Sequence, residues 1–120
     1  MIQGVFGDKG QLFFEIELIV ADEFNLPVDV MLDTGFTGFL AINKQDIDAF
    51  EWAYIGDELL LTAKGETMFT KYLGKVLLDE RDYEIPVFAG DQITEVLLGS
   101  EWLKILSLVV NYQESILTLG

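Results

Sequence analysis

The stretch "VMLDTGFTGFL" spans Val30–Leu40 and places one carboxylate, Asp33, among side chains that are mostly apolar or small. The segments on either side, Val28–Leu32 and Gly38–Ile42, are strand-length runs dominated by apolar residues. Asp and Gly are common turn residues, and Gly35 would let another segment of backbone approach closely. The stretch therefore predicts two strands joined by a sharp turn that holds a carboxylate at a strand end.

The rest of the chain predicts a mainly β fold. Turn signals recur at short intervals, with strand-length runs between them. One run, "LFFEIELIV", alternates apolar and acidic residues from Phe14 to Leu18, as a half-buried strand does. One or two short helices are also expected, one starting at Asn43 and one with Ser100 as its N-cap. No linker or repeat interrupts the pattern, so we expect a single domain over residues 1–120.

The composition of the chain argues against several classes of partner and of chemistry. The chain has 21 Asp and Glu, 7 Lys and Arg and no His, for a formal net charge of −14. Phosphate backbones and anionic lipid surfaces would be repelled, so we expect no nucleic acid and no membrane as partner. Because the chain also has no Cys, thiol nucleophiles, Ser-His-Asp relays and His-ligated zinc are excluded. Carboxylates are the main acid-base groups left, and we expect no metal.

The N-terminal segment lacks a basic region followed by an apolar core, and the longest apolar runs are far shorter than a membrane span. We therefore expect a cytoplasmic protein.

A second motif of similar composition follows the Asp33 turn about sixty residues later in the chain. The sequence D-T-G at Asp33–Gly35 is followed by Thr37, and an apolar-apolar-Gly triplet at Leu97–Gly99 precedes the second short helix. In this order, across the whole of a β-rich chain, these motifs resemble the retropepsin-like aspartic proteases, the retroviral-type family, and their single-domain bacterial relatives. The resemblance implies the acid protease fold, a closed β-barrel, and an aspartic endopeptidase that needs no cofactor.

The resemblance also implies a role for each matching residue. Asp33 of each of two copies would activate water, so the active form would be a homodimer acting on a peptide or protein substrate. Thr34 would bond across to the partner's equivalent loop, and Gly35 would shape the site. Thr37 would place a hydroxyl near the carboxylate, with Leu97, Leu98 and Gly99 supporting the catalytic turn from behind.

A hairpin is expected near "LTAKGETMF", with Gly65 in a positive-φ position. In the resembling proteases such a hairpin is a flap that covers the substrate. The expected flap residues are Ala63, Lys64, Gly65, Glu66 and Thr67, and Phe36 is expected beside the substrate.

Phe36 and Ser100 depart from the family's pattern. Phe36 stands where the family more often has a small residue, so it would either shape a substrate pocket or crowd the carboxylate. Ser100 stands where retroviral members have an Arg, whose ion pair links the helix to the catalytic loop. The chain could therefore also be a catalytically inactive protease-fold module for dimerisation or peptide binding, and Asp33 could be a plain turn residue.

The C-terminal "ILTLG" alternates as an edge strand would, and the N-terminal "MIQG" could do likewise. In the resembling dimers both termini interleave into a shared sheet, so we expect Ile116, Leu117 and Leu119 to help hold the dimer. A dimer would carry 2 × −14 = −28 charges, so it would need an apolar interface and should be favoured by high salt.

Overall fold

The computed structural model describes residues 1–62, 65–91 and 93–120. Strands dominate, as the sequence predicts, and make up 59% of the described residues. The strands are β1 (Ile2–Gln3), β2 (Val5–Phe6), β3 (Leu12–Ile19), β4 (Asn25–Leu32), β5 (Leu40–Asn43), β6 (Ala53–Thr62), β7 (Gly65–Leu78), β8 (Arg81–Gly90), β9 (Val96–Leu98), β10 (Leu108–Asn111) and β11 (Ile116–Leu119). The helical segments are the short α-helix α1 (Lys44–Ile47) and 3-10 turns at Ala21–Glu23, Asp48–Phe50 and Ser100–Lys104.

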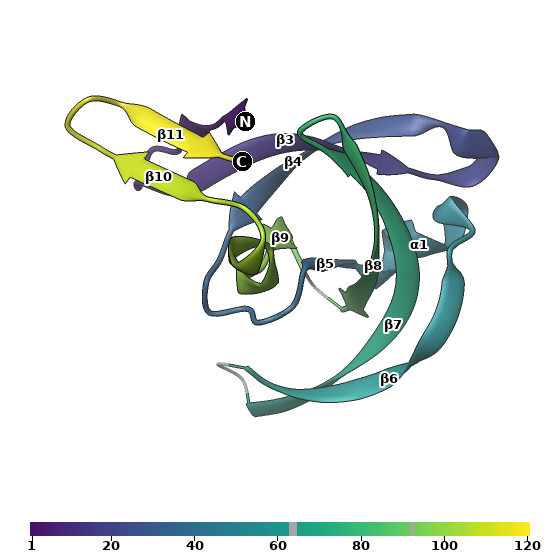
Figure 1. The fold of residues 1–120 in the computed structure, drawn as a ribbon. Helices are drawn as coiled ribbons and strands as arrows, with labels where there is room; N and C mark the ends of the chain where they lie inside the picture. The colour runs from purple at the N-terminus through teal and green to yellow at the C-terminus, as the bar shows by residue number, and fades with distance from the viewer. Residues whose placement is uncertain (63–64, 92) are drawn as a thin grey trace.

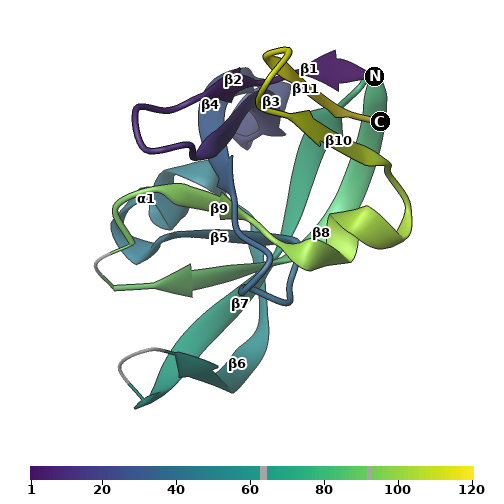
Figure 2. The same cartoon turned by 90° about the vertical axis from the view of Figure 1, so that its left-hand side faces the viewer.

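The main sheet curls into a closed barrel (Figure 1). Among the described residues, six strands form the ring in the order β3-β4-β9-β5-β8-β7, and β7 closes it by pairing back onto β3. β6 pairs with the outer part of β7, and together they form a long hairpin that extends away from the barrel (Figure 2). The predicted closed barrel is therefore confirmed, with the hairpin as an arm on one side.

The barrel interior is filled by the apolar residues that alternate along its strands. Phe14, Ile16 and Leu18 of β3 are at most 2% exposed, while Glu15 on the same strand faces solvent. Trp102 of the Ser100–Lys104 turn is fully buried, and its indole N–H donates to the carbonyl of Phe39 at 2.9 Å. That bond satisfies a polar group which would otherwise be costly to bury.

The two predicted helix starts have different outcomes. Asn43 caps α1, because its side-chain oxygen accepts a hydrogen bond from the Gln45 amide at 2.9 Å. The prediction that Ser100 is an N-cap is wrong by one residue. The 3-10 turn already includes Ser100, and Gly99 before it is the extended capping residue. The Ser100 amide instead donates to the carbonyl of Phe36, and this bond ties the backbone of Ser100 to the Asp33 turn.

The chain termini form a small sheet of their own, ordered β1-β11-β10, at one end of the molecule (Figure 2). β11 lies in the middle of that sheet, so the prediction that it is an edge strand is wrong. Leu117 and Leu119 are 3% and 0% exposed within the chain's own core, and they are not available to hold a second copy. Only Ile116 of the three, which is 40% exposed, retains a surface that a partner could reach.

Within the described ranges, no helix reaches the length and apolar character that crossing a bilayer requires.

Candidate active site

The turn that carries Asp33 joins two strands with a third strand between them. β4 ends at Leu32 and pairs in parallel with β9, and β9 pairs antiparallel with β5 on its other side. Since β4 and β5 are consecutive in the chain, their connection must cross the end of β9. This topology brings the D-T-G motif against the Leu97–Gly99 motif, although sixty residues separate them in sequence.

Backbone hydrogen bonds fasten the turn to the end of β9. They run from the Asp33 amide to the Leu98 carbonyl (2.9 Å), from Gly99 to Phe39 (2.9 Å), from Ser100 to Phe36 (2.9 Å) and from Glu101 to Gly38 (3.2 Å). Because these bonds use main-chain groups on both segments, the position of the turn depends on backbone geometry more than on any one side chain.

Gly99 is required by the closeness of the two segments. A Cβ atom at this position would lie 2.0 Å from the carbonyl oxygen of Gly38 and 2.7 Å from the ring of Phe36. No side chain fits without moving the turn. The close backbone approach that the sequence led us to expect at Gly35 is therefore found at Gly99, on the second motif.

The Asp33 carboxylate is half-buried and is oriented by its own turn. Its Oδ1 atom accepts a hydrogen bond from the Gly35 amide at 2.9 Å. A Cβ on Gly35 would lie 3.1 Å from that same oxygen, and would meet nothing else closely. Thr34 and Gly35 are exposed, so the turn presents its carboxylate at an accessible surface of the chain.

A cavity of about 470 Å³, here called the Asp33 cavity, opens beside the carboxylate. Its lining comes from the turn, from the barrel and from the hairpin: Asp33, Gly35, Phe36, Thr37, Ala41, Leu60, Leu61, Phe69, Ile93 and Leu97. The volume falls in the range of ordinary ligand sites, and the side chains of the described lining residues are apolar apart from the Asp33 carboxylate and the Thr37 hydroxyl. Such a cavity suits an uncharged segment of another polypeptide, which would lie next to the Asp33 carboxylate.

Phe36 forms part of the wall of this cavity and packs edge-on against Phe88, with the ring centroids 5.6 Å apart. A Cβ at Gly38 would lie 2.6 Å from the Phe36 ring, so two glycines, Gly38 and Gly99, make room for it. The large residue is therefore accommodated by the fold beside the carboxylate.

Five of the thirteen site residues singled out in the sequence line one cavity. Asp33, Gly35, Phe36, Thr37 and Leu97 share the Asp33 cavity. Leu98 and Gly99 are buried behind the turn, whereas Thr34 is exposed and is not among the residues that line the cavity.

The predicted hairpin is present, since Thr62 at the end of β6 faces Gly65 at the start of β7. Gly65 has φ of +99°, as expected for its turn position. Ala63 and Lys64 lie outside the described residues. Gly65, Glu66 and Thr67 begin β7 and are not among the residues lining the Asp33 cavity.

The hairpin residues that do line the cavity, Leu60, Leu61 and Phe69, were missed in the sequence. For Leu60 and Leu61, though not for Phe69, the sequence has a signal of surface contact in the apolar run Leu59–Leu61 before the turn, and in the structure Leu61 is 83% exposed. Consecutive apolar residues at the tip of an arm with no core to cover suggest contact with something else. Among the residues that the structure describes, no group of three or more acidic side chains is placed to hold a metal ion.

Comparison with known proteins identifies the fold. No protein-family model and no curated protein matches the sequence. Among solved structures, a retropepsin-like aspartic protease from Rickettsia conorii aligns over 99% of this chain and 88% of its own, with a TM-score of 0.63 and 16% identity.

The protease of EIAV in complex with the inhibitor HBY-793 aligns over 76% of this chain and 85% of its own, with a TM-score of 0.59 and 15% identity. The simian foamy virus (mac) protease aligns over 77% and 97%, with a TM-score of 0.51 and 20% identity. The chain thus has a retropepsin-like fold.

Proposed function

We propose that this protein is an aspartic endopeptidase that acts as a homodimer, with Asp33 of each copy in one shared site. The observation that carries the proposal is a half-buried carboxylate at an apolar cavity, held by two interlocked glycine-containing motifs in a retropepsin-like barrel. The chain has a single D-T-G, so one copy supplies only half of a carboxylate pair.

The chemistry needs two carboxylates that share one proton, because like charges in contact cannot both ionise. The ionised carboxylate takes a proton from water while the water oxygen attacks the peptide carbonyl carbon. The protonated carboxyl donates to the carbonyl oxygen, which gives a tetrahedral intermediate. Collapse of this intermediate, with proton transfer to the nitrogen, breaks the C–N bond and releases an amine and a carboxylic acid.

The hairpin would hold the substrate against the turn. Leu60, Leu61 and Phe69 line the same cavity as Asp33 and its turn, so a peptide in the cavity would contact both the hairpin and the turn. An extended peptide can also form main-chain hydrogen bonds with neighbouring strands, which fixes its direction without a specific side chain. Gly35, Phe36 and Thr37 would shape the floor on which the scissile bond lies.

The test compares wild-type protein with Asp33→Asn on a mixed peptide library, at several pH values between about pH 4 and pH 7. We expect wild-type cleavage and a loss of at least about 100-fold in the variant, the size of a general acid-base contribution. Asp29→Asn is the matched control, because Asp29 is an exposed carboxylate on β4, the strand that leads into the Asp33 turn, and it is paired with Glu15 on β3. It should cleave as the wild type does.

Equal cleavage by wild type and Asp33→Asn would show that this carboxylate is not the catalyst. Saturable peptide binding without cleavage at any pH would instead favour the non-enzymatic peptide-binding module that the sequence left open.

A further inference from the structure

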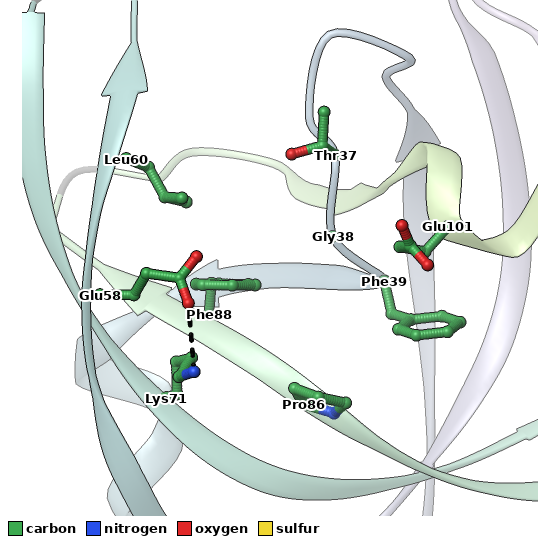
Figure 3. A pocket seen from close by; sticks show the side chains of 9 residues that line it. All are labelled: Thr37, Gly38, Phe39, Glu58, Leu60, Lys71, Pro86, Phe88 and Glu101. Atoms are coloured by element: carbon green, nitrogen blue, oxygen red, sulfur yellow. Dashed lines mark hydrogen bonds and ion pairs between the residues drawn. The ribbon is translucent and has the colours of Figure 1, made fainter.

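A further cavity, here called the side cavity, adjoins the Asp33 cavity. It has a volume of about 290 Å³, and Thr37 and Leu60 line both cavities. A peptide lying over Asp33 could therefore place one side chain in the side cavity without leaving the site. Its floor is apolar and includes Phe39, Pro86 and Phe88 (Figure 3).

The side cavity differs from the Asp33 cavity in its charge. Among its described lining residues are the carboxylates of Glu58 and Glu101 and the ammonium of Lys71. Figure 3 shows Glu58 and Glu101 on opposite sides, with Phe88 between them. Lys71 Nζ lies 3.1 Å from Glu58 Oε1, so a lysine ammonium already occupies one end of this space. Among the described lining residues, no second cation is available to Glu101.

Glu101 is held in place by the catalytic turn. Its amide donates to the Gly38 carbonyl at 3.2 Å, so its backbone is tied to the segment that carries Asp33. Its carboxylate pairs with Lys104, whose side chain is 72% exposed and does not line the cavity. An exposed pair one helical turn apart contributes little and can open at small cost when another cation arrives.

We propose that the side cavity binds a lysine or arginine side chain of the substrate peptide, with Glu101 as the residue that selects the positive charge. This proposal rests on the proposed function, since it places the peptide over Asp33. The long stem of a basic side chain suits the apolar floor, and its charged end would lie between the carboxylates and over the Phe88 ring. The net charge of −14 attracts basic peptides in general. The test must therefore separate this general attraction from binding in the side cavity.

The test measures peptide binding in the Asp33→Asn background, so that no cleavage is needed. Pairs of ten-residue peptides differ at one position, which carries lysine in one member and norleucine in the other, and that position is moved along the peptide. Norleucine keeps the stem and lacks the charge. We expect one position at which lysine improves binding about tenfold, the size of a charge-assisted hydrogen bond.

Glu101→Gln should remove most of that preference and leave norleucine peptides unaffected. Glu15→Gln is the control, because it removes an equal charge from an exposed position on β3 and should keep the preference. A preference that is absent at every position, or that both variants reduce equally, would overturn the proposal. If wild type cleaves no peptide while the preference and its loss in Glu101→Gln persist, the protease function fails and the side cavity stands as a basic-residue site.

Discussion

At the scale of single residues, glycine fixes the position of the Asp33 carboxylate. Gly99 allows contact with the Gly38 carbonyl, and Gly38 and Gly99 together leave space for the Phe36 ring. The D-T-G motif and the second motif are therefore parts of one packing unit, and neither Gly38 nor Gly99 is needed for a positive φ. The question raised by Phe36 in the sequence has a steric answer: the ring is accommodated by those glycines and forms a wall of the cavity.

Gly99→Ala is predicted to destabilise the fold through this contact. The backbone of Gly99 has φ of −89°, which alanine adopts easily, so any effect comes from the Cβ atom 2.0 Å from the Gly38 oxygen. Because a backbone atom must move, we expect a loss of about 1–3 kcal/mol or more in the free energy of unfolding. Urea denaturation measures it.

Gly35→Ala is the matched variant, since its Cβ would meet only the Asp33 carboxylate at 3.1 Å. We expect its free energy of unfolding to stay within about 1 kcal/mol of wild type, while cleavage falls because the carboxylate is displaced. Equal stability of the two variants would contradict the packing account of Gly99.

At the scale of elements, the sequence predicts the features that depend on a local residue pattern. It does not predict the features that depend on how distant strands pair. The alternation of β3, the strands on both sides of Asp33 and the helix start at Asn43 all follow from neighbouring residues, and all are confirmed. The place of β11 between β1 and β10 depends on pairing between distant segments, which a single strand's pattern does not encode. For the same reason Leu60, Leu61 and Phe69 could not be placed at the cavity from sequence alone.

The β6–β7 hairpin gives a prediction about substrate binding. Leu61 is 83% exposed yet lines the Asp33 cavity, so it contributes little to the folded chain and would be covered by a bound peptide. We expect Leu61→Ser to change the free energy of unfolding by less than about 0.5 kcal/mol. The loss of about 1 kcal/mol of apolar contact should raise KM about fivefold, with kcat little changed.

Leu59→Ser is the control for that variant. Leu59 is on the same strand and 51% exposed, but it is not among the residues lining the cavity. Steady-state kinetics with one cleaved peptide should show a raised KM for Leu61→Ser alone. The same rise in both variants would mean that the hairpin acts through a general apolar surface.

At the scale of the whole molecule, the proposed function depends on a second copy of the chain. The fold completes its barrel and its terminal sheet without a partner, because β1 pairs with β11 of the same chain. An interleaved sheet of the expected kind would require those strands to exchange partners. A dimer in which each chain keeps its own terminal sheet, and in which the Asp33 turns meet, requires no such exchange.

Mixing subunits tests whether the site is shared between chains. If dimers form at random, adding an equal amount of Asp33→Asn places half of the wild-type chains in mixed pairs that have one carboxylate. The activity of a fixed amount of wild type should then fall to about one half, and to about one quarter with a threefold excess of the variant. The fall should develop as subunits exchange, and it should be absent when the variant is added immediately before the assay. When the variant carries a size tag, sedimentation resolves mixed dimers from unmixed ones and so shows whether exchange has taken place. Wild-type activity that stays constant after such exchange would mean that each chain works with its own Asp33, and the shared site would be abandoned.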